Sequence, residues 1–261
     1  MTSSRWRHLA TVIALLCGAP AVATAASMQD LLRAYPDALS GFDGTNLIWR
    51  DGTRMQVSDG RPDKTMAEQL RAGSILDQLQ LVYPTGAALL PPPQQDPGRV
   101  RNLAFFTKMY GNCRTNEVAP KLVPVVWLPR MWGHTVSITS VNGVDRQLTA
   151  ISHELDELPA EDMKYLHPLG GTYTCRPVAD TGQSSMHAWG AAIDINPAYS
   201  NYWLWSRNGS GLPAYINHIP PEIVSIFERH GFIWGGRWAH FDTMHFEYRP
   251  ELLGYDPKTD Q

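Results

Sequence analysis

The pattern of apolar and polar positions predicts short strands mixed with a few helices. Helical spacing of apolar residues predicts helices over 28–35, 65–79 with a break near Gly73, 144–158 and 222–230. Alternating or short apolar runs predict strands within 46–57, around the turn Asp51-Gly52, and over 121–128, 135–141, 172–178, 191–195, 232–234 and 244–248. Strands and helices do not alternate as they do in parallel sheets. The pattern therefore predicts an α+β fold, a small antiparallel sheet with flanking helices.

The N-terminus predicts a secretory signal peptide over residues 1–25. Arg5 and Arg7 precede an apolar run, 9–17, that is too short to span a bilayer, and small residues at 23–25 form a cleavage site. A buried N-terminal helix is the alternative interpretation, and acylation of Cys17 is a variant of export. We therefore expect a periplasmic or secreted protein that has no stable membrane insertion after cleavage.

The composition is that of a globular protein. The chain has 261 residues, of which 43% are hydrophobic and 18% charged, and its formal charge is −3. This charge argues against a nucleic-acid partner, because nucleic-acid binders usually carry a basic stripe. The sequence gives no clear signal on oligomeric state.

Removal of the signal peptide leaves two cysteines, Cys113 and Cys175. Export places them in an oxidising compartment, where a lone pair of cysteines usually bonds. We therefore predict a disulfide between them, with two separate buried thiols as the alternative.

Two short motifs contain the residues of a candidate zinc site. A catalytic zinc ion needs three protein ligands of nitrogen or oxygen type and one open position, and His187, Asp194 and His245 supply that set. Asp242 stands three residues before His245, an offset that can bring its carboxylate near the ion without ligating it. There it can act as the general base for an attacking water. Each residue alone has an ordinary structural interpretation, so the hypothesis depends on the joint pattern.

The two motifs, Ser-x-His-x-x-Gly-x-Ala-x-Asp over 185–194 and Asp-x-x-His-Phe-Glu over 242–247, resemble the VanY-like zinc peptidases of bacterial cell-wall peptides. These are D-alanyl-D-alanine carboxypeptidases and dipeptidases and L-alanyl-D-glutamate endopeptidases, which share their fold with the hedgehog signalling domain. The stretch 170–176 also looks like the family's strand before the first motif. The resemblance covers about residues 150–250. It implies a hedgehog-like core, one Zn²⁺ ion and peptidoglycan stem peptides as substrates.

The resemblance also implies roles for single residues. His187, Asp194 and His245 bind Zn²⁺, Asp242 is the general base, and Arg176 steadies the developing oxyanion. A structural salt bridge is the alternative for Arg176.

Four further residues near the motifs are candidates for roles around the site. Ser185 and Trp189 are expected to shape the substrate cleft, although Trp189 is equally explained as a core residue. His240 is a candidate outer partner of the site or a packed ring, and Glu247 is a candidate to orient a metal-ligating His or a solvated acid.

The predicted organisation has three parts. A signal peptide over 1–25 is followed by an N-terminal extension with a hairpin over 26–100 and by a catalytic region over 101–261, with its core at 150–250. The predicted function is a secreted zinc-dependent peptidase, and the type of bond cleaved stays open. A carboxypeptidase needs a group for the terminal carboxylate, for which Arg237 or a residue of the extension is a candidate. The alternative from another class is a non-catalytic peptidoglycan-binding or structural protein with a vestigial metal site.

Overall fold

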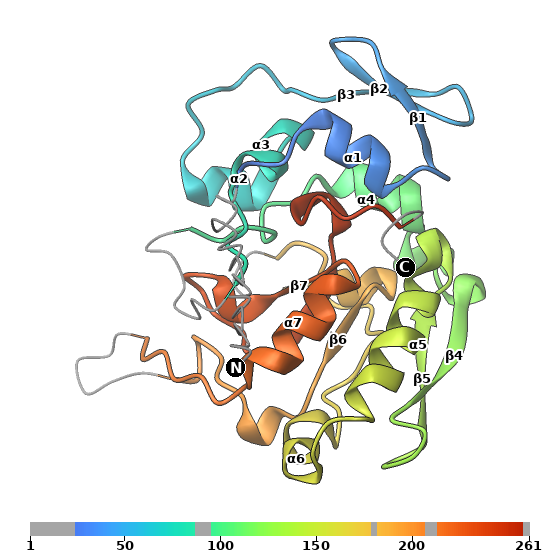
Figure 1. Ribbon diagram of the computed structural model, residues 1–261. Coiled ribbons are helices and arrows are strands. Elements are labelled where there is room, and N and C mark those ends of the chain that lie inside the picture. The colour runs from blue at the N-terminus through green and yellow to red at the C-terminus, as the bar shows by residue number, and fades with distance from the viewer. Residues whose placement is uncertain (1–23, 87–94, 179–181, 207–212, 258–261) are drawn as a thin grey trace, which may run out of the picture.

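The computed structural model describes residues 24–86, 95–178, 182–206 and 213–257. These residues form helices and small antiparallel sheets, so the predicted α+β fold is confirmed (Figure 1). Most of the expected signal peptide, residues 1–23, lies outside the described residues. Within the part that is described, we find no helix with the length and apolar character needed to cross a membrane.

A three-stranded antiparallel sheet lies at the centre of the fold, with its strands in the order β6-β8-β7. Its strands are β6 (Ala192–Asp194), β7 (Phe232–Trp234) and β8 (His245–Tyr248). The helix α7 (Pro221–Arg229) packs against β7 and lies beside α5 (Val144–Leu155) (Figure 1). The ring of Phe246 on β8 stacks on Phe227 of α7 at 3.8 Å between centroids. One side of the sheet is thus fixed in the apolar core.

A two-stranded sheet supports α5 on its other side. It pairs β4 (Leu122–Trp127) with β5 (His134–Thr139), and α5 packs against β4. The backbone N–H of Thr139, at the end of β5, donates to the carbonyl of Gly190 at 2.8 Å. This bond ties the second sheet to the first of the two motifs.

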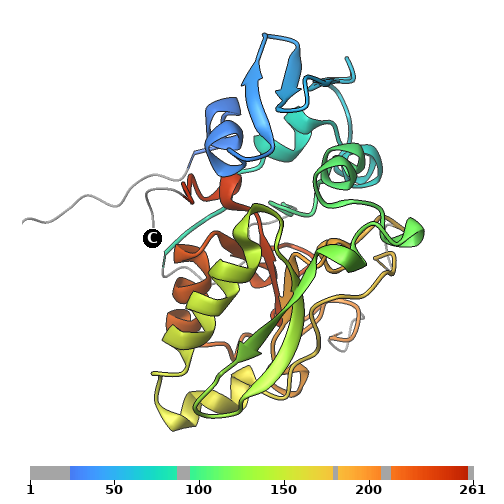
Figure 2. The same ribbon diagram turned by 90° about the vertical axis from the view of Figure 1, so that its right-hand side faces the viewer.

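The N-terminal extension folds as helices around a small three-stranded sheet. Its elements are α1 (Met28–Ala34), β1 (Leu39–Phe42), β2 (Asn46–Trp49), β3 (Arg54–Gln56), α2 (Met66–Ala72) and α3 (Ile75–Gln80). The predicted hairpin is the pair β2–β3, and the predicted helix break lies at Gly73, after which Ser74 caps α3. Figure 2 shows this part stacked on one end of the remaining molecule. Its apolar residues belong to the same buried cluster as those of the central sheet, so the core is continuous across residue 100.

The structure differs from the predicted elements in several places. The predicted strand over 172–178 forms only the isolated bridge Pro177↔Ser184, and Pro177 has no N–H for a regular ladder; Gly171, just before it, bridges Asp194. Helix α5 ends at Leu155 rather than at 158. The structure adds α4 (Leu103–Tyr110), α6 (Met163–Leu166) and β1. Short 3₁₀ turns complete the described chain at Cys113–Thr115, Ala119–Lys121, Val141–Gly143, Ala160–Asp162, Met186–Trp189, Pro197–Tyr199, Gly235–Arg237 and Pro250–Leu252.

A disulfide joins Cys113, after α4, to Cys175, and their Cα atoms are 5.7 Å apart. The bond closes a loop with a sequence separation of 62 residues. In the chain-entropy picture, such a loop stabilises the fold by about 4 kcal/mol. Because the stretch around Cys175 has few ladder hydrogen bonds, the disulfide also anchors the segment that carries Arg176.

Candidate metal centre and active site

Strand pairing brings the second ligand candidate opposite the third. In the β6–β8 register, Asp194 is the direct cross-strand partner of His245, and Ala192 is the partner of Glu247. His245 and Glu247 are two residues apart on β8, so their side chains leave the same face of the strand. The residue between them, Phe246, points to the opposite face and into the core. The sheet alone therefore places three of the polar groups together.

A short 3₁₀ turn positions His187 beside this pair. Ser185 caps the turn, and its Oγ accepts from the His187 N–H at 3.4 Å. Gly190 ends the turn at a φ of +66°, which favours glycine. A Cβ atom on Gly190 would also lie 2.5 Å from Leu122 Cδ2 and 3.3 Å from the Thr139 nitrogen. The glycine is needed both for its conformation and for the close approach of β5.

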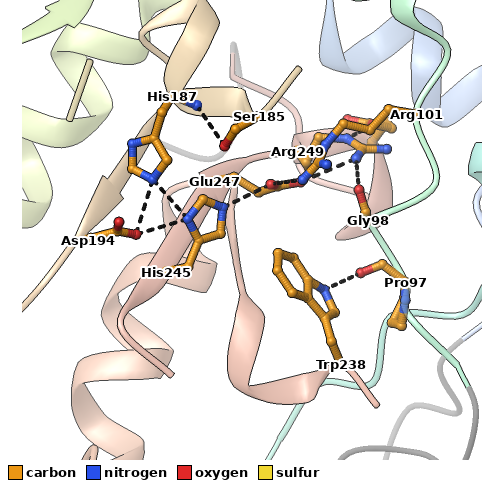
Figure 3. A network of polar contacts seen from close by, with 11 residues as sticks. Pro97, Gly98, Arg101, Ser185, His187, Asp194, Trp238, His245, Glu247 and Arg249 are labelled. Atoms are coloured by element: carbon orange, nitrogen blue, oxygen red, sulfur yellow. Dashed lines mark hydrogen bonds and ion pairs between the residues drawn. The ribbon is translucent and has the colours of Figure 1, made fainter. Parts of the chain in front are cut away.

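Three side-chain atoms from these elements form a nearly equilateral triangle. His187 Nε2 lies 3.1 Å from Asp194 Oδ1 and 3.0 Å from His245 Nδ1, and His245 Nδ1 lies 3.0 Å from Asp194 Oδ1. Figure 3 shows the three groups pointing toward one another. The two His side chains and Asp194 are the one His/Asp group of this kind found in the described residues.

Hydrogen bonds to residues outside the triangle fix which ring nitrogen of each His faces it. His187 Nδ1 lies 2.5 Å from the carbonyl oxygen of Thr172, which can only accept, so Nδ1 carries the hydrogen and Nε2 keeps its lone pair. His245 Nε2 donates to Glu247 Oε2 at 3.0 Å, which leaves Nδ1 toward the triangle. Such partners of metal-ligating His residues set the tautomer and the ring orientation.

The charges around the triangle favour a cation. Burial disfavours the charged form of His245, but Asp194 and Glu247 outweigh it and raise the pKa of His245 to about 10. The pKa of Asp194 is lowered despite burial, because His187 and His245 stabilise its carboxylate. Without a metal ion, the proton on His245 supplies the positive charge between the ligands. A metal ion supplies that charge when it displaces the proton.

The dimensions also fit a small divalent ion. Tetrahedral zinc with bonds of about 2.0–2.1 Å places its ligand atoms about 3.3 Å apart. The three observed separations are within a few tenths of an ångström of that value. Two imidazoles and one carboxylate are the donor types of catalytic zinc, and three protein ligands leave one position open.

Asp242 contributes a second carboxylate to the same site. It lines the same cavity as the triangle, and its Oδ1 is buried with no hydrogen-bond partner among the described residues. Burial, together with the negative charge of Asp194, raises the pKa of Asp242 to about 7. An ion between the ligands would lower that pKa. A carboxyl group in this range can both accept and donate a proton near neutral pH.

The cavity that contains these groups has a volume of about 440 Å³. Ser185 and Arg176 line it, as do the three ligand candidates, so the structure brings together most of the predicted site residues. Arg176 is exposed, and the described residues offer its guanidinium no ion-pair partner. This differs from the structural salt bridge that was its alternative.

The position of Trp189 differs from the substrate-cleft role predicted from the sequence. Its side chain is only 2% exposed and packs against Phe106 at 5.4 Å between ring centroids, and it is absent from the cavity wall. The substrate-cleft role predicted for Trp189 therefore disagrees with the structure, and its core alternative agrees. The apolar neighbours Ala188 and Ala191 in the same motif already indicate a buried turn.

The two outer candidates differ in their contacts. Glu247 is completely buried and contacts His245, Arg101 and Arg249 (Figure 3). His240 lines the cavity, where its Nδ1 pairs with Asp96 at 2.7 Å and its ring meets Trp203 edge to face. No contact joins His240 to the three ligand candidates within the described ranges. Arg237 is buried against Glu228, away from the cavity.

Two cavity residues, Arg99 and Arg101, were not predicted from the sequence. They lie at the junction of the extension and the catalytic region, where no motif marks them. The aromatic residue Trp205 also lines the cavity and is 69% exposed.

Replacing Glu247 with Gln is expected to weaken Zn²⁺ binding by about tenfold to a hundredfold, because His245 loses the charged partner that orients it. Titration calorimetry with Zn²⁺ measures the change directly. Glu228→Gln is the matched control, since Glu228 is also a carboxylate paired with an arginine but lies outside the cavity. Unchanged zinc affinity in a folded Glu247→Gln variant would contradict the orienting role.

Comparison with known proteins connects this geometry to a family. A family model described as D-alanyl-D-alanine carboxypeptidase matches residues 179–248, which contain the ligand candidates and Asp242. No curated protein and no solved structure matched the chain. The family match supports a peptidase and confirms the resemblance first seen in the two motifs. Over the segment 179–248, the chain is similar to the D-alanyl-D-alanine carboxypeptidase family.

Proposed function

We propose that the protein is an exported, zinc-dependent peptidase that hydrolyses the stem peptides of peptidoglycan. The observation that carries the proposal is the triangle of His187, Asp194 and His245, whose lone pairs meet at one point inside a cavity that also holds Asp242. The family match supports cell-wall peptides as the substrate class. The predicted signal peptide agrees with that substrate, because peptidoglycan lies outside the cytoplasmic membrane.

His187, Asp194 and His245 would hold the ion. When bound, zinc polarises a scissile carbonyl and lowers the pKa of a water, chemistry that needs the open position left by three ligands. Thr172 and Glu247 keep the two imidazoles in the required tautomers.

The remaining steps belong to side chains of this protein. Asp242 accepts a proton from the attacking water and returns it to the leaving amine as the peptide bond breaks. Arg176, with a fixed charge on the cavity wall, stabilises the oxyanion that develops on the carbonyl oxygen. Ser185 holds the turn that presents His187 and forms part of the wall.

Digestion of defined muropeptides by the purified protein tests this function. We expect hydrolysis that stops with a chelator and returns with Zn²⁺, and mass spectrometry of the products gives the bond cleaved. Loss of one terminal D-alanine and internal cleavage give different masses. Binding of muropeptides without hydrolysis, in a sample that contains no zinc, would instead support the non-catalytic alternative.

A further inference from the structure

We propose that Arg101 is a positioning residue of the metal centre, and that the N-terminal extension takes part in metal binding through it. The proposal rests on the proposed function and deepens it, because it names what sets the metal affinity of the same site. Arg101 acts through Glu247, the carboxylate that contacts His245, rather than on the ion itself. It lies at the junction of the extension with the catalytic region, outside the segment 179–248 that the family model matches.

One oxygen of Glu247 links the arginine to a metal ligand. Glu247 Oε2 accepts from His245 Nε2 at 3.0 Å, and the same oxygen pairs with Arg101 Nη2. Arg249 Nη1 lies 3.4 Å from the other oxygen, Oε1. The carboxylate is therefore held at both oxygens, in the orientation that leaves His245 Nδ1 toward the triangle (Figure 3).

Burial makes this arrangement sensitive to the loss of Arg101. Glu247 is completely buried, and the side chain of Arg101 is 8% exposed. A carboxylate in the interior depends on its charged partners, because water does not replace them there. Without Arg101, Glu247 would be drawn toward Arg249 and away from the oxygen position that accepts from His245 Nε2. A metal-ligating imidazole that loses the bond fixing its ring binds the ion less tightly.

The backbone that carries the arginine is fixed on one side by the catalytic region. The Trp238 indole N–H donates to the carbonyl of Pro97 at 2.6 Å, and Arg249 Nη1 donates to that of Gly98 at 2.6 Å (Figure 3). Gly98 has a φ of +100°, and a Cβ atom there would lie 2.2 Å from Ile233 Cδ1 on β7. A residue without a side chain is therefore needed for this segment to approach the central sheet so closely.

The extension holds the same backbone from the other side. The N–H of Asn102, the next residue, donates to Gln78 Oε1 on α3 at 2.9 Å, and the Asn102 side-chain amide donates to the carbonyl of Gly73 at 3.1 Å. Gly73 packs so closely that a Cβ atom there would lie 2.7 Å from Val100 Cγ1. These contacts of the extension, on both neighbours of Arg101 in the chain, set where its backbone lies.

A double-mutant cycle measured by titration calorimetry with Zn²⁺ tests the proposal. It compares the unmodified protein, Arg101→Gln, Glu247→Gln and the double variant. We expect Arg101→Gln alone to weaken Zn²⁺ binding by about tenfold, at the lower end of the effect of outer partners of metal ligands. In the Glu247→Gln background it should cause no further loss, because the carboxylate through which it acts is gone. Equal losses in the two backgrounds would overturn the proposal.

Binding of Co²⁺ in place of Zn²⁺ gives a readout that a loss of stability alone does not move. The visible absorption bands of protein-bound Co²⁺ depend on the positions of its ligand atoms. We expect Arg101→Gln to shift these bands in the same direction as Glu247→Gln, because both variants release the ring of His245. Bands with the energy and intensity of those of the unmodified protein would contradict a positioning role.

Arg237→Gln is the matched control for Arg101→Gln. Arg237 is also buried and also pairs with a carboxylate, Glu228, at 2.8 Å, but it lies outside the cavity. Its replacement should lower thermal stability while the Zn²⁺ affinity and the Co²⁺ spectrum persist. A loss of Zn²⁺ affinity as large as that of Arg101→Gln would mean that any buried arginine has this effect, and the proposal would be wrong.

The outcomes separate this proposal from the function on which it rests. If the unmodified protein binds no Zn²⁺, the proposed function fails and the positioning role fails with it. If Arg101→Gln binds Zn²⁺ as tightly as the unmodified protein, only the positioning role fails. If Arg101→Gln does not fold, the double variant decides, because it leaves no unpaired charge between the two positions. It should bind Zn²⁺ as Glu247→Gln alone does, and a further loss of affinity overturns the proposal.

Discussion

Replacing His187 with Ala is expected to lower zinc affinity by more than about a hundredfold and to abolish peptide hydrolysis. Loss of an outer partner alone costs metal sites about tenfold to a hundredfold, and loss of a direct ligand costs more. Removing the imidazole leaves Asp194 and His245 as two ligands of the group. Zinc titration and hydrolysis of a stem peptide measure the two effects.

His230→Ala is the matched control for this substitution. His230 is also largely buried and also contacts a carboxylate, Glu154, but it lies outside the cavity of the triangle. Its removal should change thermal stability while zinc binding and hydrolysis persist. If the folded His187→Ala protein bound zinc as tightly as the unmodified protein, the assignment of the metal centre would be wrong.

Replacing Asp242 with Asn is expected to reduce kcat by about 10²-fold to 10⁴-fold while zinc affinity changes little. The amide keeps the shape of the side chain but cannot accept a proton, and general acid–base groups contribute about this much to rate. KM should change less than kcat, because Asp242 acts on the reacting water and the leaving amine. Steady-state kinetics with parallel zinc titrations separate the two roles.

Asp145→Asn provides the comparison for a carboxylate outside the cavity. Asp145 lies in the first turn of α5, and its change should affect stability slightly and kinetics hardly at all. A kcat for Asp242→Asn close to that of the unmodified protein would exclude Asp242 as the general base. A loss of zinc binding as large as the loss of rate would instead make Asp242 a ligand.

The sequence predicted the parts of the fold that local chemistry determines. Helices α1 and α7 and the break between α2 and α3 follow from apolar spacing and from capping residues such as Ser74. The strand predicted over 172–178 did not form, because the stretch makes only an isolated bridge at Pro177, which has no N–H to donate to a ladder. The disulfide at Cys175 holds the stretch in place instead.

The residues of the candidate site also divide into those that the sequence predicted and those that it did not. The metal triangle and Asp242 were predictable because they lie within two short motifs whose spacing carries the chemistry. Arg99 and Arg101 were not, because their position depends on Gly98 meeting Ile233 and on the Trp238 bond to Pro97, contacts between segments more than a hundred residues apart. Trp189 is the opposite case: it lies within a motif, but its side chain packs in the core and takes no part in the site.

A row of buried charges has an evolutionary consequence. From His245 the row runs through Glu247 to Arg249, then to Glu251 and finally to the hydroxyl of Tyr35, the residue that follows α1, with bonds of 3.0, 3.4, 2.6 and 2.7 Å. Loss of any one charge leaves its neighbour unpaired in the interior, which costs several kcal/mol.

Positions 35, 249 and 251 should therefore change together over descent rather than singly. Relatives that lack the extension should also lack the Arg249–Glu251 pair, although they keep His245. The extension and the catalytic region would then be inherited as one unit, and an alignment of relatives can show whether they are.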